Sequence, residues 1–113
     1  MDMEEKILNF LKGMGFVCYM EEPVKKPSEY VLIEKTGSSD AGDGLYSSLY
    51  AFRSYSTSMY KASNLNEKVK AAVMDMPQNI PGITDATLNS DYNFTDTDTR
   101  RYRYQSVFDI IHF

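Results

Sequence analysis

The segment from Leu45 to Ser56 restricts the fold most, because it reads as a strand with apolar side chains at both alternating positions. Successive side chains of a strand point to opposite faces of its sheet. One set is Leu45, Leu49, Ala51 and Tyr55, and the other is Tyr46, Tyr50 and Phe52. We therefore expect one face to pack on the domain, which leaves the apolar groups of the other face to be explained.

The neighbouring segments predict two hairpins. Tyr30 to Thr36 contains consecutive Val, Leu and Ile and predicts a strand covered on both faces. Gly37 to Gly44 is rich in Gly, Asp and Ser and is expected to be a flexible hairpin loop. Ile83 to Phe94 and Arg100 to Phe113 predict a second hairpin, turning at Thr95 to Thr99. Its first strand is expected to point Ala86, Leu88, Tyr92 and Phe94 inward.

Two amphipathic helices are expected around these strands. Asp2 to Met14 has helical apolar spacing with Asp2 as its cap, and a second helix follows Ser54 to Ser58 and ends near Met76. A short strand over Phe16 to Met20 and an irregular arm around Glu21 to Lys26 lie between. This order predicts one α+β domain over 1–113. Its mostly antiparallel sheet of about four to five strands carries both helices on one face.

Composition excludes several classes of protein. The 113 residues carry 12 Lys and Arg against 16 Asp and Glu, a formal net charge of −4, which disfavours a strongly basic nucleic-acid binder. No apolar run approaches the roughly 18 residues of a membrane span, and the acidic start differs from a secretion signal. A cytoplasmic origin is expected.

The sequence contains few residues suited to catalysis or metal binding. Its single cysteine, Cys18, reads as a core thiol, and its single histidine, His112, as a terminal surface side chain. Asp40 and Asp43 could bind a cation, but the EF-hand spacing is absent and a solvated loop is favoured. We expect no catalytic, cofactor-binding or metal site, and no cofactor.

Two surface features are open to more than one interpretation. Arg100, Arg101 and Arg103, beside Tyr102 and Tyr104, could stack single-stranded nucleic acid. Alternatively, Asp91, Asp96 and Asp98 neutralise them and the charges protect an edge strand. Tyr46, Tyr50, Tyr55 and Tyr60 either close the edge of the core or form an assembly surface.

The order of segments resembles a known family. The resemblance rests on Val17-Cys18-Tyr19, the Glu22-Pro23 arm, Tyr30-Val31-Leu32-Ile33-Glu34, and the acidic Gly/Ser loop. It continues with Tyr50-Ala51-Phe52-Arg53-Ser54-Tyr55-Ser56, Lys68 to Val73, Arg101-Tyr102-Arg103-Tyr104 and Phe108-Asp109-Ile110. Together these look like the tail terminator, or tail completion, proteins of long-tailed bacteriophages and prophages.

The resemblance implies a structural virion protein without catalytic residues. Such a protein forms a ring, usually of six copies, that caps the tail tube, stops its polymerisation and joins the tail to the head. Expected partners are further copies, the tail tube protein, a head–tail connector or neck protein, and genomic DNA passing through the lumen without specific binding, with no membrane involved. The expected location is the tail or neck of the virion, and the host cytoplasm during assembly.

On this interpretation the exposure pattern suggests two sets of contact residues. Subunit contacts are expected at Tyr46, Tyr50, Arg53, Arg101 and Arg103. Tube or connector contacts are expected at Glu21, Glu22, Lys25, Lys26, Ser38, Ser39, Asp40 and Asp43. A neck or head-completion protein of the same kind of virion and a small cytoplasmic binding module are the alternatives, and an enzyme is the least favoured.

Overall fold

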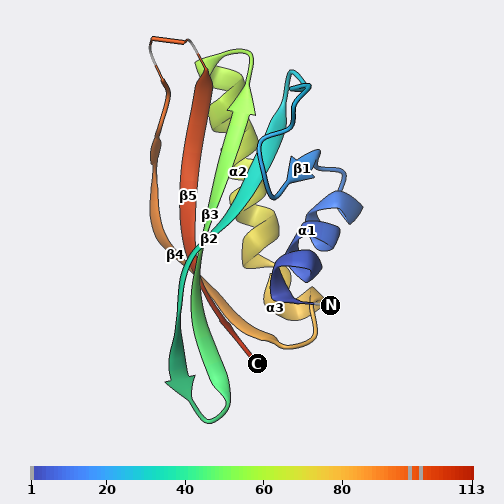
Figure 1. The fold of residues 1–113 in the computed structure, drawn as a ribbon, viewed down its shortest axis with the longest axis vertical. Helices are drawn as coiled ribbons and strands as arrows, with labels where there is room; N and C mark the ends of the chain where they lie inside the picture. Colours follow the sequence, from blue (N-terminus) through green and yellow to red (C-terminus); the bar gives the residue numbers. More distant parts are fainter. Residues whose placement is uncertain (1, 97, 100) are drawn as a thin grey trace.

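A five-stranded mixed sheet with helices on one side forms the domain (Figure 1). The structure is a computed structural model that describes all residues of 1–113 except 1, 97 and 100. In chain order its elements are α1 (Met3–Gly13), β1 (Cys18–Tyr19), β2 (Tyr30–Gly42), β3 (Leu45–Ser56), α2 (Met59–Met74), α3 (Met76–Asn79), β4 (Ile83–Asn93) and β5 (Tyr102–His112). The strands lie in the order β1-β2-β3-β5-β4. Among the described strands only the β1–β2 pair is parallel, and this mostly antiparallel sheet with helices on one face confirms the α+β fold expected from the sequence.

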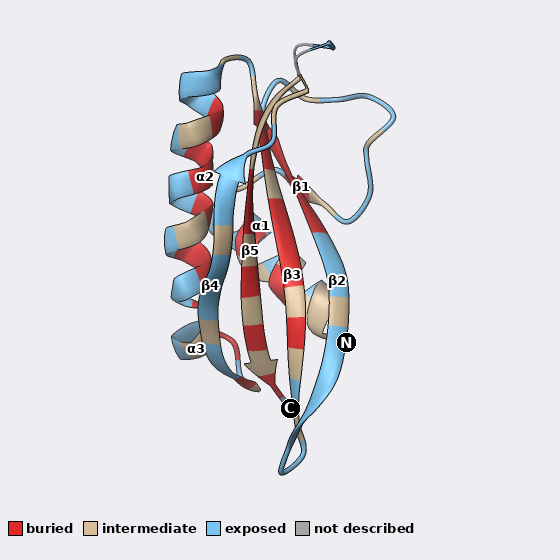
Figure 2. Ribbon diagram, turned by 90° about the vertical axis from the view of Figure 1, so that its left-hand side faces the viewer, coloured by how far each residue is buried: buried red, intermediate tan, exposed pale blue. Residues whose placement is uncertain are grey.

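Both long helices bury an apolar side against the same face of the sheet. Asp2 caps α1 by accepting a hydrogen bond from the Glu5 amide at 2.8 Å, and Ser58 caps α2 through the Lys61 amide at 3.1 Å. The core contains Ile7 and Leu11 of α1, Leu65, Val69 and Val73 of α2, and Val31, Ile33, Phe52, Phe108 and Ile110 of the sheet. Figure 2 shows the buried residues of α2 on the side turned to the strands.

The hairpin of β2 and β3 extends beyond the core, and here the prediction of a flexible loop over Gly37 to Gly44 is wrong. β2 continues to Gly42, and Asp43 and Gly44 alone make the turn, with φ of 55° and 78°. Positive φ at both central residues is what a two-residue type I′ turn requires. The exposed end of this hairpin projects past the helices in Figures 1 and 2. We call residues 36–47 the hairpin extension.

The inward set predicted for β4 is confirmed at Ala86, which packs against the core, but is wrong at Tyr92 and Phe94. The pairing of β4 with β5 shifts between Leu88 and Ser90, so the alternation changes face at that point. Leu88, Tyr92 and Phe94 are all exposed by 36% or more, and Ala86 is half-buried. β4 is the edge strand next to β5 only, and little of it is covered.

Two residues expected at the surface lie inside. Tyr50 is 0% exposed among the core residues, because β3 places it on the same face as Phe52, toward the helices. It therefore cannot contact another copy in this fold, and its assignment to a subunit interface is wrong. His112 is 8% exposed, and its Nε2 lies 2.8 Å from the Ser48 hydroxyl, since β5 continues to that residue.

Candidate functional site

The face of the sheet turned away from α1 and α2 carries a set of arginine and aromatic side chains. The register pairs Tyr55 with both Tyr30 and Arg103, so these three side chains share this face. Phe94 follows β4 and its amide donates to the Arg103 carbonyl, while Arg101 precedes β5. We call the set the arginine face: Tyr30, Arg53, Tyr55, Phe94, Arg101 and Arg103.

Stacking contacts connect these side chains across the strands. The rings of Tyr30 and Tyr55 stack with centroids 4.6 Å apart and an interplanar angle of 9°. The Arg101 guanidinium lies 4.8 Å from the centroid of Tyr55, and that of Arg103 lies 4.4 Å from Phe94. A cation over an aromatic face is attracted by the ring quadrupole, so these contacts hold the guanidinium groups against the rings.

The three arginines differ in how their charges are paired. Arg53 forms an ion pair with Glu34 at 3.1 Å and donates to Gln105 at 2.8 Å. Arg101 pairs with Glu22. Arg103 donates to the Phe94 carbonyl and, at 3.4 Å, to the Tyr55 hydroxyl, but no carboxylate of the described residues lies within ion-pair distance of it. Arg103 can therefore accept an acidic partner without losing an existing ion pair.

Glu22 fixes the arm to the arginine face. Both the Tyr30 hydroxyl and the Arg101 guanidinium donate to its Oε1, and Arg101 also lies 2.6 Å from the Tyr30 oxygen. Partial burial opposes ionisation, but these hydrogen bonds and the charge of Arg101 hold the pKa of Glu22 below its ordinary value. Burial and the bond to Glu22 raise the pKa of Tyr30. Glu22 is thus a carboxylate that neutralises part of the face.

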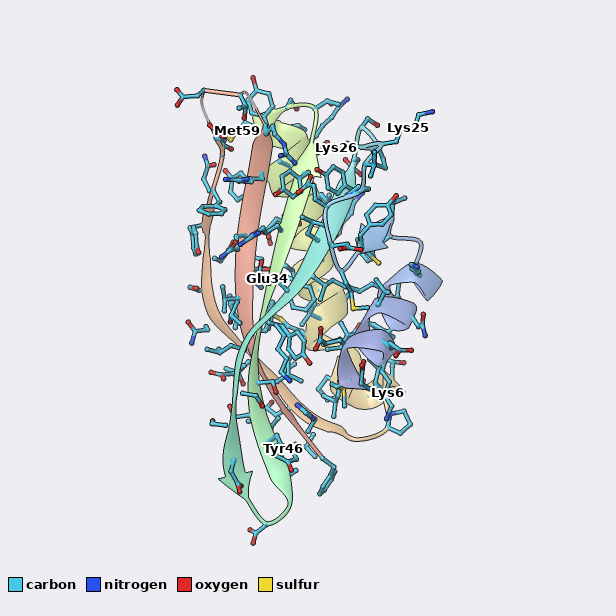
Figure 3. The ribbon with its side chains drawn as sticks, in the orientation of Figure 1. Lys6, Lys25, Lys26, Glu34, Tyr46 and Met59 are labelled. Carbon is cyan, nitrogen blue, oxygen red and sulfur yellow. The ribbon has the colours of Figure 1, made fainter. Side chains whose placement is uncertain are left out.

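The remaining predicted contact residues lie at the two ends of the molecule. Figure 3 shows Lys25 and Lys26 at the end opposite to Tyr46, which belongs to the hairpin extension. Tyr46 is 49% exposed, and its ring lies 6.0 Å from that of His112. Glu21, Lys25, Lys26, Ser38, Ser39, Asp40 and Asp43 are all exposed.

The structure brings together only part of the interface predicted from the sequence. Arg53, Arg101 and Arg103 meet on the arginine face, whereas Tyr46 lies on the alternate face of β3 and Tyr50 in the core. Tyr30 and Phe94 were not predicted as part of a site. Strand register brings these two residues to the site. The sequence pattern alone does not specify that register across the long turn before Arg101. Arg100 lies outside the described residues.

Asp91 does not neutralise the arginines as expected. Asp91 accepts instead from the Asn66 amide at 2.7 Å and pairs with Lys70, both on α2. The bulge at Leu88 and Ser90 and the side on which α2 packs explain why Asp91 faces the helix. Asp96 lies near the face, where bonds from Thr99 and Asp98 and the charge of Arg103 lower its pKa.

The structure also places the residues that could bind a metal ion or act as a nucleophile. In the part of the chain that the structure describes, no three His, Cys, Asp or Glu residues are arranged to hold a metal ion. Burial raises the pKa of the Cys18 thiol, whose Sγ lies 3.7 Å from the Leu8 carbonyl. No helix formed by the described residues has the length and apolar character needed to cross a membrane.

Comparisons with known proteins add no relative to these observations. Neither a scan against models of protein families nor a search of curated proteins matches the chain.

Proposed function

We propose that this chain is a structural virion protein that forms a ring, of six copies, on the end of a phage tail tube. The arginine face is the observation that carries the proposal. Its aromatic and guanidinium groups lie on a sheet face that neither long helix covers, and Arg103 has no carboxylate partner among the described residues. Tyr30 and Tyr55 are themselves buried, whereas Phe94 is 37% exposed and the three arginines are partly exposed. Aromatic and arginine side chains are enriched in contacts between proteins.

Ring closure follows from the kind of contact such a face can make. Its residues differ from those of the hairpin extension and of the arm, so a copy that used it to bind another region would form a head-to-tail contact. Head-to-tail contacts generate a ring when their rotation closes and a filament when it does not. A ring that matches the tube on one side only would stop further growth of the tube.

The partners follow from this arrangement. The arm, with Glu21, Lys25 and Lys26 exposed, is proposed to contact the tail tube protein or the head–tail connector. The formal charge of −4 suits a lumen through which genomic DNA passes without being held, because a basic lumen would bind phosphates. We assign the protein to the tail or neck, and to the host cytoplasm before assembly, with no reaction of its own.

Tube growth in the presence of the chain tests the proposal. Purified tail tube protein is polymerised with and without the chain, and tube lengths are measured by electron microscopy. We expect shorter tubes, each with a ring at one end, and a hexamer mass by native mass spectrometry. Unchanged tube lengths would contradict the proposal. Binding to a head–tail connector without an effect on tubes would favour a neck protein, and a monomer at every concentration would favour a binding module.

A further inference from the structure

Residues 36–45 of the hairpin extension form a two-stranded ribbon, while Tyr46 and Ser47 also pair with β5. Between Glu34 and Gly44 every residue is exposed except the half-buried Gly37. Two-stranded hairpins without a covering layer are only marginally stable in water. We therefore expect a ribbon that keeps its pairing this far from the core to pack on another surface.

The composition of the extension indicates what that surface is like. Gly37, Ser38, Ser39, Ala41 and Gly42 are small, which permits close approach of the backbone to another sheet. Within residues 36–47 the only charged side chains are Asp40 and Asp43. One Asp40 oxygen accepts from the Gly42 amide, while Asp43 has no side-chain partner among the described residues. The extension thus presents a negative, narrow tip.

The arginine face has the complementary properties. Its accessible groups are the exposed Phe94 ring and the partly exposed arginines, and Arg103 has no carboxylate within ion-pair distance in the described part of the chain. Figure 1 shows the start of β5, where Arg103 lies, at the opposite end of the molecule from the hairpin, along an axis of 45 Å. The two surfaces therefore cannot meet within one chain.

We propose that the hairpin extension of one copy docks on the arginine face of a second copy, with Asp40 and Asp43 paired to Arg103 and Arg101. The inference rests on the proposed function, because it names the contact by which the copies of the ring join. It moves Ser38, Ser39, Asp40 and Asp43 from the tube contact expected from the sequence to the contact between subunits. Each copy offers both surfaces, so the contact repeats head to tail around a ring.

A charge-swap experiment on the chain alone tests the contact. The hairpin variant is Asp40→Lys with Asp43→Lys, and the face variant is Arg101→Glu with Arg103→Glu. Self-association is measured by analytical ultracentrifugation over a concentration range. We expect each variant alone to associate at least tenfold more weakly than the native chain, because like charges then meet. An equal mixture should recover association, because each reversed surface meets its opposite.

Further variants distinguish loss of this contact from misfolding of the chain. Arg101 also binds Glu22 and Tyr30, so the pair Arg103→Glu and Asp43→Lys repeats the mixing test without disturbing the arm. Lys61→Glu with Lys68→Glu, on the exposed side of α2, makes the same change in net charge as the face variant and should leave association unchanged. Melting temperatures show that each variant is folded.

The outcomes separate this contact from the proposed function. Recovery in the mixtures supports the contact, even if the chain then fails to shorten tubes, which would contradict the function alone. Hairpin variants that associate like the native chain, or mixtures no better than their components, would overturn the contact while leaving a ring that caps tubes intact. A native chain that stays monomeric even with tube protein would overturn both.

Discussion

The hydroxyl of Tyr50 lies in the core, whereas a tyrosine hydroxyl usually reaches the surface. It is 0% exposed, and its oxygen has no hydrogen-bond partner among the described residues. Burial, with smaller contributions from the charges of Glu4 and Asp2, raises the pKa of Tyr50 to about 12. The neutral phenol is therefore tolerated and the phenolate strongly disfavoured.

Replacing Tyr50 by phenylalanine is expected to stabilise the fold. A buried hydroxyl without a partner costs roughly 1–3 kcal/mol, so Tyr50→Phe should raise the free energy of unfolding by about 1 kcal/mol at pH 7. Urea denaturation measures the change, with the exposed Tyr46→Phe as control. A less stable Tyr50→Phe would show that the hydroxyl is hydrogen-bonded.

The raised pKa also predicts a pH dependence. A group whose folded pKa lies above its unfolded value contributes stability that is complete below the unfolded value, about 10 for tyrosine, and is lost as the pH rises through about 12. The native chain should therefore lose more stability between pH 10 and 12 than Tyr50→Phe does. Equal losses in the two proteins would contradict this assignment.

Two elements reach beyond the core by different means. The hairpin extension is held by strand pairing and by the Ser38–Ser48 hydroxyl contact at 3.1 Å, whereas the arm is held through Glu22. Neither the extension nor the arm beyond Cys18 and Tyr19 supplies a residue to the main core. Changes in both should therefore act on contacts and local order more than on global stability.

Shortening the hairpin is expected to leave the fold intact. Replacing Ser39 to Ser47 by Asn-Gly joins Ser38 to Ser48 through a favourable two-residue turn and keeps the bond from Ser48 to His112. The melting temperature should stay within a few degrees, since no core side chain is removed. Circular dichroism measures this. A cooperative loss of structure would show that the extension is needed for folding.

The arm should loosen when Glu22 loses its charge. Glu22→Gln weakens the bonds to Tyr30 and Arg101, so trypsin should cleave after Lys25 several times faster, with Glu21→Gln as the matched control. Because the folded pKa of Glu22 is lowered, its contribution is present above the ordinary value of 4.5 and is lost as the pH falls through the folded value. Amide exchange in the arm, corrected for intrinsic rates, should rise there. Equal cleavage of the two variants would show that Glu22 does not hold the arm.

At the scale of the whole molecule, the shape separates two complementary surfaces. The extents are 45 × 24 × 23 Å, with the hairpin extension at one end and the start of β5 at the other. The carboxylates of the extension therefore lie far from Arg103 within one copy, and no carboxylate of the described residues lies within ion-pair distance of that arginine.

Association between copies should therefore depend on salt while folding does not. The Debye length falls from about 10 Å at 0.1 M to about 3 Å at 1 M, which screens exposed charge contacts. We expect the dissociation constant of the assembly to rise about tenfold or more over that range, with little change in melting temperature. Light scattering and calorimetry measure the two quantities. Association that strengthens with salt would indicate an apolar contact instead.

Residue spacing and local chemistry were enough to predict α1 with its Asp2 cap, α2 and the bounds of β3, but not the short helix α3. The spacing of apolar residues shows which side of α2 is buried. Because an α-helix repeats every 3.6 residues, this spacing can be read without knowing which element packs against the helix. The turn at Asp43-Gly44 was also readable, since this dipeptide favours a two-residue hairpin, but the surrounding Gly and Ser residues suggested a loop.

Only the tertiary structure decided which side chains share a face and which are covered. The bulge at Leu88 and Ser90 reversed the alternation of β4, and helix packing buried Tyr50 while leaving Arg53 on the other face. Register likewise placed Tyr30 beside Tyr55 and brought Glu22 to Arg101 across 79 positions of sequence. Such pairings depend on long-range hydrogen bonding and packing, which a local pattern of side chains does not encode.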